Sequence, residues 1–381
     1  MTTPFMQQIR LDGFLSFAPG SAPVEMRPLN VLIGPNGSGK SNLIEAFELL
    51  RATATGLAST VRQGGGVREW LWKGVSPPGN AVMEAHFERG GAPLRYRVEF
   101  ANTSDRAEIV DEVLQDDSTK FYHYLNGEPY LSVRGATGQR SDLKVDGLNR
   151  FESVLSQRKD PSGLPELALC AREFSRIQSF REWTFGRIAP VRLGQPTTAP
   201  SDVLLPDASN LGLLLNELEH SSKRADLYEW LQRFLPRFER LSTLTVGGTI
   251  QFFLHEEGLH SPVPARRISD GTLRFLALLV TLLSDDPPPL ICIEEPELGL
   301  HPDALSVVAE LLVEASARMQ LVVTTHSDVL VSRINEPESL LIADYVGGTH
   351  LRRLDPDHLD DWLQNYRLGD LWRMGHLGGN P

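Results

Sequence analysis

A glycine-rich octet near the N-terminus constrains this chain more than any other stretch. It follows the pattern G-x-x-x-x-G-K-[S/T] and consists of Gly34, Pro35, Asn36, Gly37, Ser38, Gly39, Lys40 and Ser41. An apolar run at 29–33 precedes it, and the segment 41–50 places its apolar residues on one helical stripe. This pattern binds phosphate when it joins a strand to a helix. The sequence therefore predicts a phosphate-binding loop between a buried strand and a helix.

The residue types in the octet suit a nucleoside triphosphate with Mg²⁺. Glycines allow successive backbone N–H groups to point inward, and the start of the helix adds partial positive charge. We expect Lys40 to reach the β- and γ-phosphates and Ser41 to ligate Mg²⁺, with Asn42 in the same binding segment. The alternative is a strand–helix turn that binds nothing, but the complete octet in its context favours ATP and Mg²⁺ as cofactors.

Composition narrows the class of protein. The chain has 381 residues and a formal charge of −12, so no overall positive field draws it to nucleic acid or to anionic membranes. Its two cysteines, Cys170 and Cys292, have no metal-site or disulfide spacing. The longest apolar segment, 275–283, is shorter than the roughly 18 residues that a membrane span needs. We expect a soluble, cytoplasmic protein without a membrane partner.

Hydrophobic patterning predicts an α/β protein. Alternation through 81–133 with glycine-containing turns predicts an antiparallel sheet of hairpins, and 209–234 predicts two amphipathic helices. The segment 150–190 is interpreted as helical, and 56–79 and 134–148 as loops. Strands alternate with helices through 290–325, which is typical of a parallel sheet. We expect an N-terminal lobe over 1–150, a helical insertion over 151–240 and a C-terminal lobe over 241–381.

Two acidic residues follow the apolar strand predicted at 290–293. We expect Glu294 to hold Mg²⁺ or its water, and Glu295 to orient or deprotonate the attacking water. A strand predicted at 321–325 is followed by His326. Two acids at a strand end are also compatible with a solvated loop, and a lone histidine with a structural role. Beside a phosphate-binding loop, we interpret all three as candidate catalytic or metal-binding residues.

Four segments resemble one family of nucleotide hydrolases. The stretch Leu290 to Pro302 resembles the Walker B segment of SMC/RecF-like ABC-type ATPases, whose relatives include OLD-type and other prokaryotic defence ATPases. Gly13 to Phe17 resembles the opening of these proteins, Ile268 to Thr272 their ABC signature, and Thr325 to Ser327 their switch-histidine loop. Two further segments, Leu205–Leu211 and Leu368–Gly379, resemble a group of stand-alone bacterial ATPases of this class.

The resemblance implies a P-loop head with a mixed central sheet, an antiparallel β subdomain and a helical insertion. It implies two heads that meet head-to-tail on ATP, with Ser269 and Gly271 completing the partner's nucleotide site and His326 contacting the γ-phosphate in cis. It also implies a glutamine on the Mg²⁺ side. Gln157 is our choice for this glutamine, with Gln178 and Gln195 as competitors.

Three departures from the family pattern refine the prediction. Glu294 stands where the family usually has aspartate. Asp270 and Thr272 replace the glycine and glutamine of transporter signatures, which argues against a transporter subunit. The roughly 230 residues between the phosphate loop and the signature contain no long heptad arm, which argues against a chromosome-spanning SMC protein.

Partners are predicted from charge and from the resemblance. The segment 150–192 carries eight basic side chains against five acidic ones, and Arg172, Arg176 and Arg181 form the best candidate DNA-binding patch. A solvated helix face is the alternative. About 55 residues follow His326, fewer than an appended nuclease domain needs, so we expect any nuclease to be a separate protein.

Two functions follow from these observations. The first is an ATP-hydrolysing head that dimerises on ATP and acts as a switch in DNA repair or anti-phage defence. The alternative is a nucleotide-regulated binding module with negligible turnover that controls a separate effector such as a nuclease.

Overall fold

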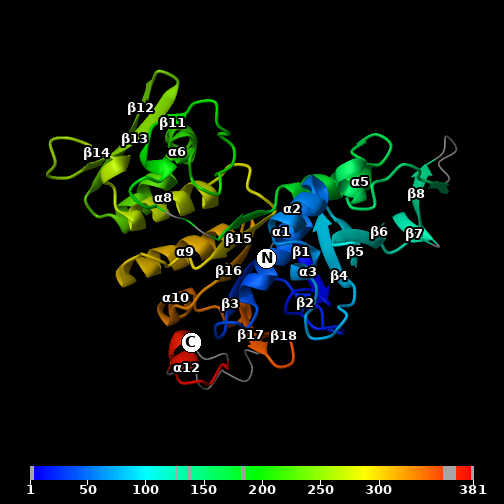
Figure 1. Cartoon of the computed structure of the whole chain (residues 1–381). Helices are drawn as coiled ribbons and strands as arrows, with labels where there is room; N and C mark the ends of the chain where they lie inside the picture. The colour runs from blue at the N-terminus through cyan, green and yellow to red at the C-terminus, as the bar shows by residue number, and fades with distance from the viewer. Residues whose placement is uncertain are drawn as a thin grey trace.

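A six-stranded sheet forms the centre of the molecule (Figure 1). The computed structural model describes residues 4–125, 127–134, 140–181, 183, 185–354 and 366–378. In spatial order the central strands are β10 (Gln178–Phe180), β15 (Leu290–Glu294), β16 (Gln320–Thr324), β3 (Leu29–Ile33), β17 (Leu340–Tyr345) and β18 (Thr349–Arg353). All neighbours are parallel except β17 and β18. The predicted α/β class with a mixed central sheet is confirmed.

The central strands are buried on both faces, which explains why they are continuous apolar runs. In β3, Val31 and Ile33 point into one hydrophobic core, and Leu32 points into a second core on the other side. Ile291 and Cys292 divide in the same way in β15. The sheet therefore separates two cores, and its rigidity fixes the loops at its carboxyl edge.

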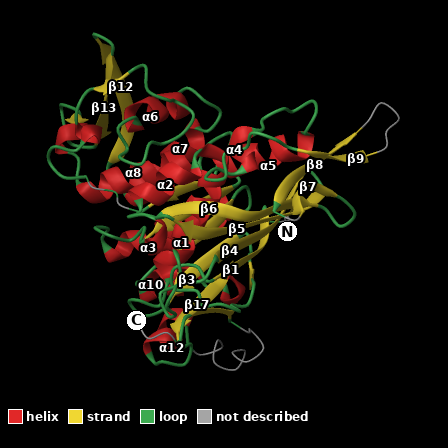
Figure 2. Ribbon diagram, turned by 45° about the vertical axis from the view of Figure 1, so that its right-hand side comes forward, coloured by secondary structure: helices red, strands yellow, loops and turns green. Residues whose placement is uncertain are grey.

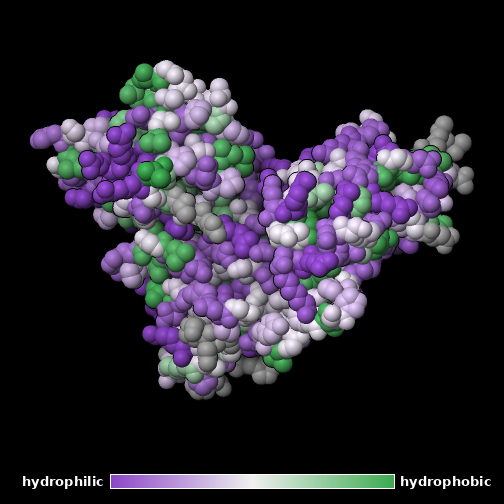
Figure 3. All heavy atoms as spheres, in the orientation of Figure 1, coloured by the Kyte–Doolittle hydropathy of each residue, from purple (hydrophilic) through white to green (hydrophobic). Residues whose placement is uncertain are grey.

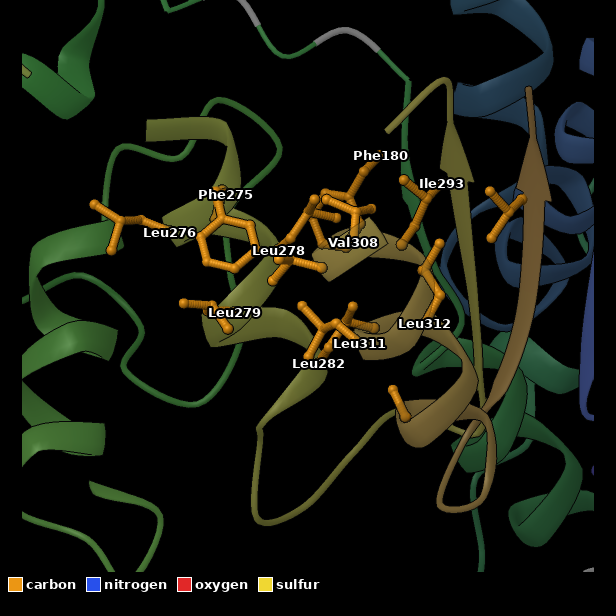
Figure 4. Close-up of a cluster of buried hydrophobic side chains, with 14 of the residues drawn as sticks. Phe180, Phe275, Leu276, Leu278, Leu279, Leu282, Ile293, Val308, Leu311 and Leu312 are labelled. Carbon is orange, nitrogen blue, oxygen red and sulfur yellow. The ribbon is translucent and has the colours of Figure 1, made fainter. Parts of the chain in front are cut away.

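Helices cover each face of this sheet. Helix α1 (Lys40–Thr55) belongs to the second core, while α8 (Asp270–Leu282) and α9 (Leu305–Ser316) pack in the first. Figure 4 shows Phe275 and Leu278 of α8 facing Val308 of α9, and Leu312 lying toward Ile293 of β15. The short helices α10 (Asp328–Ile334) and α12 (Leu368–Arg373) complete this side. None of the described helices is long and apolar enough to span a bilayer.

An eight-stranded antiparallel sheet forms one lobe, as the alternation through 81–133 predicted. Its order is β2 (Val24–Glu25), β1 (Met6–Asp12), β4 (Ala81–Arg89), β5 (Ala92–Thr103), β6 (Arg106–Gln115), β7 (Lys120–Leu125), β8 (Glu128–Arg134) and β9 (Arg140–Lys144). The helices beside it are α2 (Leu57–Gln63), α3 (Val67–Trp70), α4 (Val154–Gln157) and α5 (Pro165–Ser175). Figure 2 shows its last hairpins extending away from the central sheet.

A third, smaller sheet belongs to the opposite lobe. It contains β11 (Gln195–Pro196), β13 (Thr249–Glu256) and β12 (Phe238–Val246), and β14 (Val263–Pro264) pairs with β13. Helices α6 (Leu211–Glu219), α7 (Arg224–Phe234) and α8 share its core, so the two helices predicted in 209–234 are confirmed. Figure 3 shows a hollow between the two lobes with mainly hydrophilic residues on its walls.

Three local predictions were wrong. The segment 56–79 is not only loop, because α2 forms where Glu152 accepts hydrogen bonds from the N–H groups of Leu57 and Ala58. Strand β10 lies in the segment interpreted as helical, and it is too short for a periodic signal. Strand β9 occupies 140–144 of a predicted loop, whose residues 135–139 lie outside the described residues.

Candidate nucleotide and metal site

The predicted phosphate loop, acidic pair and histidine meet at the carboxyl edge of the central sheet. The phosphate loop follows β3, Glu294 and Glu295 lie at the end of β15, and His326 follows β16. Strand β16 pairs with β3 on one side and with β15 on the other. Because parallel strands end at the same edge, three segments separated by up to about 290 residues form one site.

The phosphate loop depends on glycine at two close approaches. A Cβ on Gly34 would lie 2.2 Å from the Ala343 carbonyl oxygen, and one on Gly39 would lie 2.0 Å from Thr349 Oγ1. Both glycines have positive φ, 149° and 98°. The Ser38 hydroxyl is buried and has no hydrogen-bond partner among the described residues. The loop is a tight backbone cradle that suits phosphate oxygens.

Lys40 folds over this cradle. Its Nζ donates to the carbonyl oxygens of Gly34, at 2.6 Å, and of Pro35, at 3.1 Å. Burial lowers the Lys40 pKa, although the charges of Glu295 and Glu294 act in the opposite direction. The ammonium group is therefore held close to both carboxylates that follow β15, in a position to neutralise an incoming phosphate.

Ser41 and Glu294 form the predicted metal pair. The Ser41 hydroxyl donates a hydrogen bond to Glu294 Oε1. A hydroxyl and a carboxylate oxygen in contact are hard ligands of the kind that Mg²⁺ prefers, so these residues fit the ion. Among the described residues no cluster of three or more His, Cys, Asp or Glu side chains suits a metal. A two-ligand protein contribution matches the usual Mg²⁺ site, in which water and phosphate supply the other ligands.

Glu295 has a strained backbone. Its φ is +47°, which is uncommon for a residue with a side chain, and its N–H donates to the Thr324 carbonyl at 3.0 Å. The strain positions the carboxylate 3.7 Å from His326 Nε2. Strained residues held by their surroundings gather at functional sites. This geometry suits a carboxylate that acts on a water molecule.

The loop of His326 is fixed by Glu297, a residue that sequence reasoning did not single out. Glu297 Oε1 accepts from Thr325 Oγ1 at 2.6 Å and from the His326 N–H at 3.0 Å. Burial raises the Glu297 pKa, against the effect of these hydrogen bonds. Burial and the Lys40 charge lower the His326 pKa, which favours a neutral imidazole near pH 7. The only sequence signal for this role is the position of Glu297 within the Walker B-like segment Leu290 to Pro302.

The signature residues begin helix α8. Ser269 is the N-cap, and its hydroxyl accepts from the Thr272 N–H. Ser269 and Asp270 are exposed. Helix α8 lies in the lobe of the third sheet rather than beside α1 (Figure 1). A Cβ on Gly271 would lie 2.8 Å from the Gly299 carbonyl, so glycine allows α8 to approach the loop that follows Glu295. The signature start and this loop are in direct contact within one subunit.

None of the three candidate glutamines reaches the carboxyl edge. Gln157 hydrogen-bonds to Asn149 and to the Glu152 carbonyl, near the far end of α1, a helix about 24 Å long. Gln178 is the first residue of β10, at the opposite end of the strand. Gln195 is buried, and its side chain bonds to the backbone of Val191 and Gly212. The structure thus corrects the choice of Gln157, which rested on sequence position alone.

Arg181 lies where a Mg²⁺-side residue was expected. It directly follows β10, whose last residue Phe180 pairs with Ile293, so Arg181 is level with Glu294. Its Nε donates to Glu294 Oε2 at 3.1 Å. The sequence analysis assigned Arg181 to the candidate DNA patch and not to this site, because the preceding strand has only three residues and gives no periodic signal.

The three arginines of the predicted DNA patch do not act as one basic surface. Arg172 pairs with Glu173, Arg176 pairs with Asp286, and Arg181 belongs to the site just described. Two of the three, Arg176 and Arg181, are therefore paired with acids from elsewhere in the chain.

Comparisons with known proteins identify the family of this chain. The family described as AAA domain, putative AbiEii toxin, Type IV TA system matches residues 29–332. Old nuclease of Escherichia phage P2 is 21% identical over 366 residues, which cover 88% of this chain and 59% of that nuclease. An ATP/GTP phosphatase of Helicobacter pylori is 17% identical over 339 residues, which cover 87% of this chain and 88% of that protein.

Solved structures of SMC heads share the fold. A head bound to the C-terminal winged-helix domain of ScpA aligns with a TM-score of 0.58 at 15% identity, over 93% of this chain and 99% of that one. A head derived from Pyrococcus furiosus, bound to the C-terminal domain of ScpA, gives 0.58 at 14% identity, over 95% and 99%. The family match spans most of the chain, and the phosphate loop and acidic strand end lie within it. The chain therefore belongs to the family described as AAA domain, putative AbiEii toxin, Type IV TA system, and it contains an ATPase-like P-loop domain of the SMC/OLD type.

Proposed function

We propose that this chain is a Mg²⁺-dependent ATPase head that dimerises on ATP and acts as a switch in DNA repair or anti-phage defence. One observation carries the proposal. Lys40, the Ser41–Glu294 pair and the Glu295–His326 pair converge on one edge of the central sheet.

Each of these groups has a role in phosphoryl transfer to water. Lys40 and the backbone N–H groups of residues 37–41 bind the β- and γ-phosphates. Ser41 and Glu294 hold Mg²⁺, which when bound neutralises charge on those phosphates. Glu295 orients the attacking water and accepts its proton, and neutral His326 lies beside it to contact the γ-phosphate.

A cleft beside the phosphate loop is the proposed nucleoside site. Its volume is about 550 Å³, and its lining includes Ser16, Asn42, Trp72 and Tyr345. Asn42 follows the phosphate loop directly, and its amide donates to Ser16 Oγ at 2.6 Å. Aromatic side chains suit a purine base and polar ones suit a ribose, so this cleft is matched to a nucleoside attached to the bound phosphates.

The proposed dimer uses Ser269 and Gly271 of each subunit at the other subunit's nucleotide. Both lie at the start of α8, a helix of 13 residues whose N-terminus favours anions, and Ser269 is exposed. The exposed charge of Asp270 is partly balanced by Arg192. The contact of α8 with the loop after Glu295 gives this surface a fixed position relative to the chain's own site.

The cellular role is proposed from the relatives. The description of the matching family includes a putative AbiEii toxin of a toxin–antitoxin system, and one relative is a nuclease of a phage. Both facts support a switch in defence. The chain spans 59% of that nuclease. Because that relative is named a nuclease, the alternative is a nucleotide-regulated binding module with negligible turnover that controls a separate effector such as a nuclease. Cys170 and Cys292 are free and buried, as suits the reducing cytoplasm.

Phosphate release tests the enzyme claim. We expect Mg²⁺-dependent release of phosphate from ATP that falls at least a hundredfold in Glu295→Gln. Glu257→Gln, which changes an exposed acid in the third-sheet lobe, is the matched control and keeps full activity. Equal, slow release by the natural chain and Glu295→Gln, together with tight ATP binding, would favour the binding module instead.

Light scattering tests the dimer. We expect Glu295→Gln to be monomeric without nucleotide and dimeric with Mg·ATP, because bound ATP is not consumed. Adding Ser269→Arg places a bulky cation at the predicted interface and should abolish the dimer. A mass that does not respond to ATP would refute nucleotide-dependent dimerisation of this chain.

A further inference from the structure

Arg181 is surrounded by three carboxylates. Its guanidinium lies 3.1 Å from Glu294, 3.1 Å from Glu45 and 3.5 Å from Glu48. Glu45 and Glu48 lie on the face of α1 that also carries Ser41, four and seven residues earlier. Burial alone would lower the Arg181 pKa, but the three acids together raise it. The site therefore contains a permanent cation beside the proposed metal ligand.

This cation contacts one of the two carboxylate oxygens of Glu294. One carboxylate oxygen accepts from the Ser41 hydroxyl, and the other accepts from Arg181. Both protein groups that fit Mg²⁺ are thus already hydrogen-bonded in the chain alone. A metal ion that binds Glu294 must weaken at least the Arg181 contact, because two cations would otherwise share one carboxylate at close range.

We propose that Arg181 is an internal counter-ion of the metal site, a positioning residue that holds Glu294 until Mg²⁺ displaces it toward Glu45 and Glu48. This inference rests on the proposed metal–nucleotide site. The two glutamates on α1 make the displacement feasible, since Arg181 already contacts both and keeps a charged partner when it leaves Glu294.

A displacement of Arg181 would also affect the signature residues at the start of α8. Trp183 and Phe185, which follow Arg181 in the chain, accept hydrogen bonds from two arginines, one in α8 and one bound to the signature region. The Trp183 carbonyl accepts from Arg274 of α8 at 3.1 Å. The Phe185 carbonyl accepts from Arg192, which also donates to the Ile268 carbonyl at 2.7 Å. We therefore expect a shift of Arg181 to reach α8 through the contacts of Trp183 and Phe185, which would link metal binding to the surface proposed to meet the partner.

A simple structural ion pair would behave in the opposite way. If Arg181 only braced the site, its removal would leave Glu294 poorly placed and weaken metal binding. If Arg181 competes with the metal, its removal frees a carboxylate and strengthens metal binding. The two roles predict opposite signs.

The test measures Mn²⁺ binding by electron paramagnetic resonance, on the full chain saturated with a non-hydrolysable ATP analogue. For Arg181→Gln we expect Mn²⁺ to bind about tenfold more tightly, the size expected when one partly exposed charged hydrogen bond is released. Arg181→Lys keeps the charge and should stay within about threefold of the natural chain. Arg176→Gln is the charge-matched control, because Arg176 pairs with Asp286 away from the site, and it should bind Mn²⁺ unchanged.

A second variant tests the same idea with the reverse sign. Glu45→Gln removes one of the acids that receive Arg181, so Arg181 stays on Glu294 and Mn²⁺ should bind several-fold more weakly. This variant keeps the proposal testable even if Arg181→Gln does not fold. The fluorescence of Trp183 is obtained by subtracting the spectrum of Trp183→Phe from that of the natural chain. We expect this Trp183 fluorescence to change when Mn²⁺ binds, and we expect the change to be lost in Arg181→Gln.

Unchanged or weaker Mn²⁺ binding in Arg181→Gln, or tighter binding in Glu45→Gln, would overturn the counter-ion role. Binding of a fluorescent ATP analogue without metal is recorded separately. Failure of the natural chain to bind the analogue overturns the proposed function itself. Analogue binding without any Mn²⁺ binding overturns the metal site and the counter-ion role together.

Discussion

Arg192 offers the sharpest test of how the signature region is held. Its side chain is only 7% exposed. It donates to the carbonyl oxygens of Phe185 at 2.8 Å, Ile268 at 2.7 Å and Ala265 at 3.2 Å, and it also pairs with Asp270. The carbonyl bonds and the ion pair differ in burial, so their energies should differ as well.

We expect the buried bonds to dominate. Hydrogen bonds from a charged donor contribute about 1.5–3 kcal/mol each, and partial rehydration reduces the sum of three to about 3–5 kcal/mol for Arg192→Met. The entropy of unfolding of a 381-residue chain is about 0.8 kcal/mol/K, so the Tm should fall by about 4–6 °C. The Asp270 side chain is 67% exposed, so Asp270→Asn should cost about 0–1 kcal/mol and shift the Tm by about 1 °C or less.

Thermal unfolding followed by circular dichroism measures both variants, and light scattering with Mg·ATP measures the consequence for the proposed dimer. Arg192→Met should lose ATP-dependent dimerisation at temperatures where the rest of the chain is folded. If Asp270→Asn lowers the Tm as much as Arg192→Met, or if neither variant does, then the buried carbonyl bonds do not hold the signature region.

Three further variants test the site and its surroundings. Glu297→Ala removes an acceptor for the His326 N–H and should lower phosphate release at least tenfold, whereas Glu297→Gln, which keeps a carbonyl oxygen, should recover most of it; equal rates in both would refute the positioning role. Because the His326 pKa is lowered by folding, the unfolded chain binds the proton first between that pKa and about 6.5, so stability falls as the pH drops through this window. The loss of Tm between pH 7.5 and 5.5 should therefore be smaller in His326→Gln, and an identical loss would contradict this account. Gly271→Ala places a Cβ 2.8 Å from the Gly299 carbonyl and should cost about 1–3 kcal/mol and weaken the dimer, while Gly186→Ala, which meets nothing within 4 Å, should do neither; equal effects would mean that the contact is unimportant.

The parts of the fold that could be predicted from the sequence are those that local chemistry decides. The phosphate loop carries its own glycines, and β3, β15 and β16 are apolar runs because both of their faces are buried. The hairpins of 81–133 alternate because one face of their sheet covers the second core. In these segments each residue's neighbours along the chain determine its conformation.

The parts that were missed depend on distant partners. Helix α2 begins where Glu152, about 95 residues later, accepts its first N–H groups. Arg181 was interpreted as part of a basic surface because its acidic partners, Glu45 and Glu48, lie more than 130 residues earlier. The side chain of Gln157 is bound to backbone near α1's far end, which no local pattern reveals. Charge counted along the sequence does not show which charges are paired in space.

The contact between Gly271 and the Gly299 carbonyl has a consequence for stoichiometry. In the proposed dimer, the start of α8 faces the partner's nucleotide, and the loop that begins at Glu295 serves the chain's own nucleotide. Because these two segments touch within one subunit, a shift at either nucleotide is passed to the other. The two nucleotide sites of the dimer would then hydrolyse ATP in a coupled way rather than independently. A mixed dimer with a single Glu295→Gln subunit should therefore lose more than half of its turnover.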